Sequence, residues 1–128
     1  MENAIRVIRL NAGEKLTSPS AVCLGFFDGV HLGHQALLKA TVETARARGL
    51  TPCVHTFRRM PAQAMHPEKQ ILELTSLEEK LRLFAQAGIE AVGLSEFDDE
   101  TRRMSARAFI EKTLIGDLSA RYIVAGYN

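Results

Sequence analysis

The chain has 128 residues, of which 46% are hydrophobic and 24% are charged, and its formal net charge is +1. The length suits one domain, and the composition is that of an ordinary globular protein. A charge this close to zero favours neither nucleic acid nor an anionic membrane as a partner. The sequence lacks an apolar run of roughly 20 residues, as a membrane span requires, and its start does not resemble a signal peptide. We therefore expect a cytoplasmic protein.

The two cysteines are predicted to be reduced core residues. Cys23 and Cys53 each lie in an apolar run, and the sequence contains no C-x-x-C motif or Cys/His cluster. Small buried thiols are common in the cores of intracellular proteins. Neither a disulfide nor a cysteine-bound metal is expected.

The first half of the chain alternates between predicted strands and a predicted helix. A short apolar segment at residues 5–10 is the first strand, and the continuous apolar run at 21–24 is typical of a strand covered on both faces. Apolar side chains recur at helical spacing over residues 35–48, and Gly49 is suited to the turn that ends a helix. Residues 51–57 are the third predicted strand.

The second half continues this alternation after a long loop. Residues 58–74 contain two prolines and no periodic pattern, and loops of this length are often functional. Ser76 and Glu79 form a capping-box pattern before a helix that Gly88 would end. The remaining predicted elements are a strand at 89–94, a solvated acidic turn at 98–100, a helix after Ser105, and a strand at 121–126. The helix would carry Phe109, Ile110, Thr113 and Leu114 and end near Gly116.

Strands separated by helices predict an α/β fold with a mostly parallel sheet, to which the first strand is an added edge. Ligands of such sheets bind at the carboxyl ends of the strands. Three segments are expected at that end: the turn after residues 21–24, the pair Thr56-Phe57, and residues 126–128.

The turn after the second strand, Gly25 to His34, contains the most distinctive pattern. It carries three glycines and leads directly into the predicted helix, with His31 and His34 at the helix start. Helix starts present unpaired N–H groups and a partial positive charge, so they favour anions such as phosphate. Imidazoles beside such a site can donate hydrogen bonds to phosphate oxygens.

These residues resemble a known family. His31, Gly33 and His34 match the H-x-G-H signature of the nucleotidylyltransferases. The surrounding sequence is similar to the adenylyltransferase module of prokaryotic FAD synthetases, which is usually joined to a riboflavin kinase. The further matching blocks are Thr56-Phe57 with Pro61, residues 74–80, Phe97-Asp98 with Ser105-Ala106 and Phe109-Ile110, and residues 124–128.

The resemblance implies a Rossmann-like nucleotidylyltransferase fold and the reaction of ATP with FMN to give FAD and pyrophosphate, with Mg²⁺. It implies that residues 1–128 form one FMN adenylyltransferase-like nucleotide-binding domain, incomplete at its C-terminus and without the riboflavin kinase module. The implied catalytic residues are His31 and His34, with no metal ligand assigned. The implied nucleotide-binding residues are Gly25, Phe26, Phe27, Asp28, Gly29 and Gly33, and the implied flavin-binding residues are Thr56, Phe57 and Asn128.

The sequence departs from the family pattern at three places. Phe26 stands where the family usually has Asn, and Arg59-Met60 replaces the Pro-His of its Thr-Phe-x-Pro-His-Pro motif. The sequence stops at Asn128, before the family's later ATP-binding motif. Two alternatives therefore stay open: nucleotidyl transfer to another phosphate acceptor, and a non-catalytic nucleotide-binding or interaction protein.

Several polar residues have two interpretations. Asp28 lines the nucleotide site or is only a turn residue. His55 is expected to be a strand residue with a satisfied hydrogen bond rather than a ligand. Arg58 and Arg59 either meet substrate phosphates or form a solvated loop pair.

Overall fold

The computed structural model describes residues 5–25, 27, 32–58 and 76–125. Its centre is a five-stranded sheet with the order β1-β4-β3-β2-β5, in which every pair of neighbours is parallel. The strands are β1 (Arg6–Arg9), β2 (Ser20–Leu24), β3 (Thr51–Phe57), β4 (Ala91–Ser95) and β5 (Ala120–Val124). The predicted parallel α/β sheet is confirmed, and the first strand is an edge as expected.

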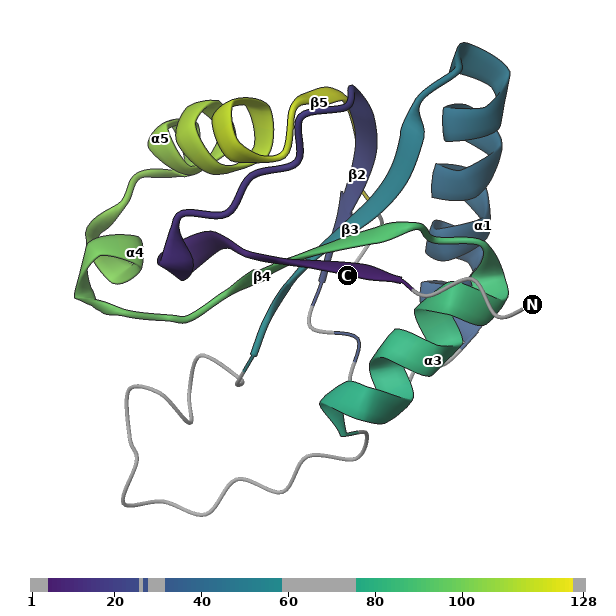
Figure 1. The fold of residues 1–128 in the computed structure, drawn as a ribbon, viewed down its shortest axis with the longest axis horizontal. Helices are drawn as coiled ribbons and strands as arrows, with labels where there is room; N and C mark the ends of the chain where they lie inside the picture. The colour runs from purple at the N-terminus through teal and green to yellow at the C-terminus, as the bar shows by residue number, and fades with distance from the viewer. Residues whose placement is uncertain (1–4, 26, 28–31, 59–75, 126–128) are drawn as a thin grey trace.

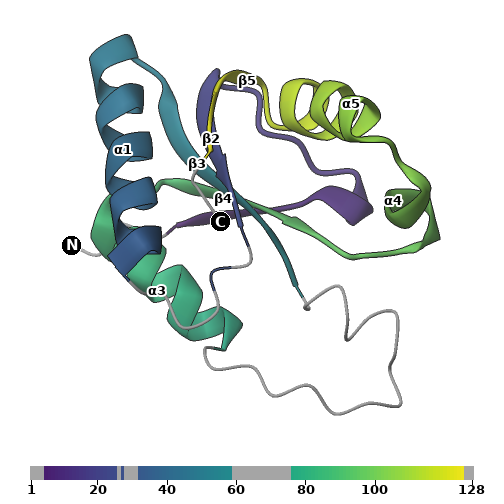
Figure 2. The same ribbon diagram turned by 180° about the vertical axis from the view of Figure 1, so that it is seen from behind.

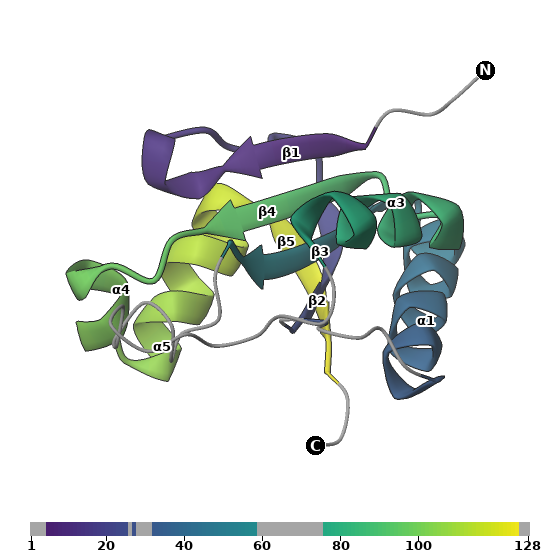
Figure 3. The same cartoon turned by 90° about the horizontal axis from the view of Figure 1, so that it is seen from below.

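Helices cover both faces of this sheet, so the molecule has three layers (Figures 1 and 2). One face carries α1 (Leu32–Arg48) and α3 (Leu77–Ala87). The opposite face carries a longer helical segment, made of α5 (Ala106–Ala108) and η2 (Phe109–Asp117), with α4 (Asp99–Arg103) near it (Figure 3). A short 3₁₀ helix, η1 (Leu10–Ala12), follows β1. No helix in the described ranges is long and apolar enough to cross a bilayer.

The strand order reverses at β2. The chain runs outward from β2 through β3 to β4 and then returns to the other side of β2 with β5. Leu24 is registered with His55 on one side, and Cys23 with Val124 on the other. The carboxyl ends of β3, β2 and β5 therefore lie side by side, which is where open α/β sheets bind their ligands.

Each helical layer has its own hydrophobic core. The α1–α3 layer packs on one face of the strands through Leu38, Val42 and Phe84, and the η2 layer packs on the other face through Leu114 and Leu118. Cys23 belongs to the first cluster and Cys53 to the second, and both are free and buried as predicted.

Local signals place the ends of α1 and α3. The Oγ of Ser76 accepts a hydrogen bond from the Glu79 N–H at 3.2 Å, which is half of the predicted capping box. Gly49 and Gly88 follow the two helices with φ angles of 67° and 101°. Side chains other than glycine rarely adopt this conformation, so both predicted helix ends are confirmed.

One prediction for the last third of the chain was wrong, and another was confirmed except in one detail: the helix capped by Ser105 is present, but its inner part is not an α-helix. The acidic run 98–100 is exposed, but it begins a helix rather than a turn, because the Asp98 carboxylate accepts the Thr101 N–H at 2.8 Å. The helix η2 has π geometry, in which the Leu118 N–H donates to the Thr113 carbonyl five residues earlier. A π turn contains more residues than an α turn, and Ile110, expected in the apolar stripe, is 38% exposed.

Candidate functional site

Gly25 begins the turn at the end of β2, and its backbone is held against β3. The Gly25 N–H donates to the carbonyl of His55 at 3.2 Å. A Cβ atom at this position would lie 2.8 Å from Cε2 of Phe27 and 3.1 Å from its Cζ. Real Cβ atoms do not approach that closely, so the ring of Phe27 requires a glycine here.

Phe27 anchors this turn in the core. Its φ of 61° lies in the left-handed region, and its side chain is only 1% exposed. The ring centroid lies 5.0 Å from that of His34 in α1 and 5.1 Å from that of Phe84 in α3. The buried ring thus packs against both helices and presents almost no surface to a ligand.

The N-terminus of α1 follows the turn. The helix begins at Leu32, its first turn contains Gly33 and His34, and that turn carries no acidic residue. Its last turn contains Arg46 and Arg48. This charge distribution leaves the partial positive charge of the helix start unopposed from within the helix, which favours an anion there.

A row of four rings lies on the η2 face of the sheet, at the carboxyl ends of β3 and β4. In order, the rings are Phe109, His55, Phe57 and Phe97, with neighbouring centroids 5.0, 5.2 and 5.4 Å apart. Each neighbouring pair is edge-to-face, with interplanar angles of 81°, 88° and 84°. This geometry is favourable for aromatic pairs and gives the row a defined shape.

His55 is buried within that row at 2% exposure. Its Nε2 atom lies 2.9 Å from Oγ of Ser95 on β4. Burial lowers the pKa of His55 from 6.5 to about 4, so its imidazole is neutral near pH 7. The expectation of a strand histidine with a satisfied hydrogen bond is confirmed.

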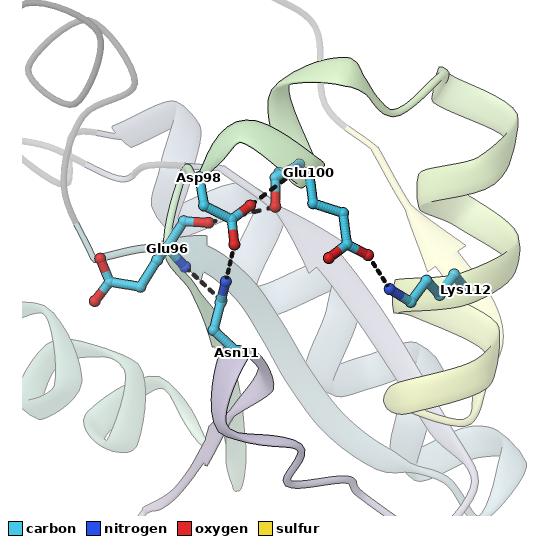
Figure 4. A network of polar contacts seen from close by, with 6 residues as sticks. Asn11, Glu96, Asp98, Glu100 and Lys112 are labelled. Atoms are coloured by element: carbon cyan, nitrogen blue, oxygen red, sulfur yellow. Dashed lines mark hydrogen bonds and ion pairs between the residues drawn. The ribbon is translucent and has the colours of Figure 1, made fainter.

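The chain leaving β3 is tied to the end of β4. The Arg58 guanidinium pairs with Glu96 at 3.1 Å, and both side chains are about half exposed. Asn11 supports the same corner, since its Oδ1 accepts the Glu96 N–H at 2.7 Å and its Nδ2 donates to Asp98 at 2.8 Å (Figure 4). The Thr101 N–H, which donates to the Asp98 carboxylate, keeps the pKa of that group below its usual value.

The structure describes six of the predicted site residues. Gly25, Phe27, Gly33 and His34 belong to the turn and to the start of α1, and Thr56 and Phe57 end the neighbouring strand β3. The predicted site residues Phe26, Asp28, Gly29, His31 and Asn128 lie outside the described residues, as does Arg59.

The described side chains offer no ligand set for a metal ion. Within these ranges no three His, Cys, Asp or Glu side chains come together in a way that could hold one. Mg²⁺ prefers carboxylates, water and substrate phosphates, and the nearby Glu96 and Asp98 carboxylates are already engaged with Arg58 and Asn11. We therefore assign no step to a protein-held Mg²⁺.

Sequence reasoning missed Ser95 and Phe97 as neighbours of Phe57. The predicted strand ended at residue 94, whereas β4 runs to Ser95. Extending its period-two alternation places Gly93, Ser95 and Phe97 on one face. This alternation, together with the pairing of Ser95 opposite Phe57, is the signal from which Ser95 and Phe97 could have been predicted as neighbours of Phe57.

A sequence model of the FAD synthetase family matches residues 13–128. The bifunctional riboflavin kinase/FMN adenylyltransferase of Bacillus subtilis (strain 168) is 36% identical over 110 residues, covering 85% of this chain and 34% of that protein. The protein of that name from Escherichia coli (strain K12) is 36% identical over 103 residues, covering 80% of this chain and 33% of the relative. This chain therefore spans about a third of the length of these relatives.

The fold has a counterpart among solved structures. A crystal structure described as a macrolide-efflux protein from Streptococcus pneumoniae superposes with a TM-score of 0.81 at 28% identity, over 94% of this chain and 48% of that one. The family match covers four of the five strands, the turn after β2 and both ends of the aromatic row. This chain belongs to the FAD synthetase family.

Proposed function

We propose that this chain transfers the adenylyl group of ATP to FMN, forming FAD and releasing pyrophosphate, and that residues 1–128 form the nucleotide-binding domain for this reaction. One juxtaposition supports the proposal. In a member of the FAD synthetase family, the turn that leads from β2 into α1 begins beside the end of β3, the strand that carries His55 and Phe57 of the aromatic row. The helix start suits phosphates, and the rings suit a planar flavin.

The β2–α1 side of the site is assigned to ATP. His31 and His34 donate hydrogen bonds to its phosphate oxygens, at the end of a helix whose dipole also favours negative charge. Phe27 contributes by holding the turn, since its own ring is buried. The full set of residues assigned to the nucleotide is Gly25, Phe26, Phe27, Asp28, Gly29 and Gly33.

The β3 side is assigned to FMN. Phe57 is half-buried and belongs to the aromatic row, so one part of its ring can meet a flavin while the rest is held by its neighbours. Thr56, buried beside it in β3, and Asn128 complete the residues assigned to this side.

The chemistry needs no covalent intermediate on the protein. An oxygen of the FMN phosphate attacks the α-phosphorus of ATP, the new P–O bond forms, and the bond to the β-phosphate oxygen breaks. Negative charge builds on the transferring group and on pyrophosphate, so positioning and hydrogen bonds from the histidines supply the catalysis. Mg²⁺ enters this proposal only as the ion that ATP carries on its own phosphates.

The test is formation of FAD by the purified chain supplied with ATP, Mg²⁺ and FMN, followed by chromatography. His34→Gln should lower the rate about 100-fold, as expected for loss of a donor to the transition state. Phe84→Leu is the matched control, because it disturbs the same Phe27 ring from α3 without touching the imidazole.

The control separates chemistry from packing. Phe84→Leu should lower the melting temperature and leave most of the rate. If both variants lose activity in proportion to their loss of stability, the phosphate role of His34 is wrong. If the wild-type chain forms no FAD but ATP still raises its melting temperature, the chain binds nucleotide without catalysis, and the proposed function is overturned.

A further inference from the structure

His55 lies where the two assigned sides of the site meet. Its main-chain carbonyl accepts the N–H of Gly25, the first residue of the turn after β2. Its side chain contacts the rings of Phe57 and Phe109 and pairs with Ser95. One residue therefore touches the phosphate-binding turn through its backbone and the aromatic row through its ring.

Ser95 is placed to orient this imidazole. In the parallel register Ser95 stands directly opposite Phe57, while His55 stands opposite Gly93. Phe57 and His55 are two residues apart, so their side chains lie on the same face of β3. The hydrogen bond between Ser95 and His55 thus runs diagonally across the two strands.

The surroundings allow the imidazole few alternatives. His55 is 2% exposed and Ser95 is 5% exposed, so neither can exchange its partner for water without opening the layer under η2. Rings are present on two sides of the imidazole, at 5.2 Å for Phe57 and 5.0 Å for Phe109. A fixed imidazole therefore fixes the edge of Phe57 against which it packs.

We propose that His55 and Ser95 form a positioning pair for the flavin, which sets the ring of Phe57 relative to the turn that begins at Gly25. The inference rests on the proposed function, since it assigns the flavin to Phe57. His55 touches neither substrate in this proposal and acts through Phe57. The neutral state of the buried imidazole supports the pairing, because no charge is placed among the rings.

The pair is tested by separate binding measurements for the two substrates. The dissociation constant of FMN is measured from quenching of flavin fluorescence, and that of ATP by calorimetry. Ser95→Ala should weaken FMN binding about tenfold, the effect of one buried hydrogen bond, and leave ATP binding unchanged. In the His55→Leu background the same serine change should have no further effect, because Ser95 acts through His55.

Cys53→Ala is the matched control. Cys53 lies two residues before His55 on the same face of β3 and is fully buried, but it belongs to the core below the aromatic row. Its loss should lower stability and leave both dissociation constants unchanged. If Cys53→Ala and Ser95→Ala weaken FMN binding equally, the His55–Ser95 pair contributes only to stability, and the inference is overturned.

The remaining outcomes distinguish this inference from the proposed function. If the wild type binds FMN and Ser95→Ala binds it equally well, the positioning pair is wrong and the proposed function stands. If Ser95→Ala weakens ATP and FMN binding alike, the pair stabilises the carboxyl end of the sheet as a whole and does not specifically position the flavin. The inference is then also overturned. If the wild type binds ATP but no FMN, the proposed function fails, and the positioning role fails with it.

Discussion

The close approach of Gly25 and Phe27 makes the turn sensitive to a single methyl group. Gly25→Ala should destabilise the protein by about 1–3 kcal/mol, because the added Cβ displaces a ring that packs on both α1 and α3. Urea denaturation measures the change. In a Phe27→Leu background the same substitution should cost less, since the smaller side chain leaves room. Equal costs in both backgrounds would show that the ring is not the cause.

His55 should make stability depend on pH. Its pKa is about 4 in the folded protein and about 6.5 when unfolded, so between these values only the unfolded chain binds the proton. The contribution of His55 is fully present above pH 6.5 and is lost as the pH falls toward 4, by at most about 1.4 kcal/mol per pH unit. The measurement is the stability difference between wild type and His55→Gln, which should shrink from pH 7 to pH 4.5. The other histidines are common to both proteins, so a constant difference would contradict the burial of a neutral imidazole.

At the scale of the element, α3 depends on its cap. Ser76→Ala should destabilise the protein by about 1 kcal/mol, because the Glu79 N–H loses its acceptor at the helix start. Ser76→Asp is the control, since a carboxylate can accept the same hydrogen bond and also favours the helix dipole. Denaturation midpoints of the three proteins give the comparison. The cap has no energetic role if alanine and aspartate behave alike.

The same element shows how far sequence alone can lead. Ser76 and Gly88 are local signals, each acting within a few residues, and they placed both ends of α3. The strand at 51–57 was predicted with its observed bounds for the same reason. The π geometry of η2 was not predicted. The same sequence is compatible with an α-helix and with a π-helix, and the packing of the segment decides between them.

Contacts distant in sequence were harder to predict than the elements. The sequence placed Thr56 and Phe57 at the ligand end of the sheet, but it did not pair His55 with Ser95, forty residues later. Nor did it indicate that Phe27, within the glycine turn, adopts a positive φ and turns its ring into the core. Both features depend on tertiary packing between elements that are far apart in the sequence, and local sequence patterns do not specify that packing.

For the whole molecule, the sheet should be least protected at its β1 edge. Among the described residues, β1 pairs with β4 and with no other strand. Asn11, in the segment that follows β1, holds this edge through hydrogen bonds with Glu96 and Asp98. Asn11→Ala should speed hydrogen exchange of the β1 amides about tenfold, while the amides of β2 and β3 are unchanged. Exposed Lys15 is the control position, and Lys15→Ala should leave the pattern as in wild type. Uniform acceleration in all strands would instead mean that Asn11 affects global stability.

The position of β5 beside β2 has a consequence for the order of folding. The two strands pair Ser20 with Ala120, so they are about a hundred residues apart. In contrast, β2, β3 and β4 follow one another along the chain, with the described helices α1 and α3 between them. Contacts between distant segments are slow to form, and a chain emerging from the ribosome can assemble β2, β3 and β4 before β5 exists. His55 and Phe57 are then in place early, while Phe109, the ring at the other end of the row, arrives with η2 just before β5. Because β5 is the last strand to pair beside β2, we expect substrate binding to appear only when folding is complete.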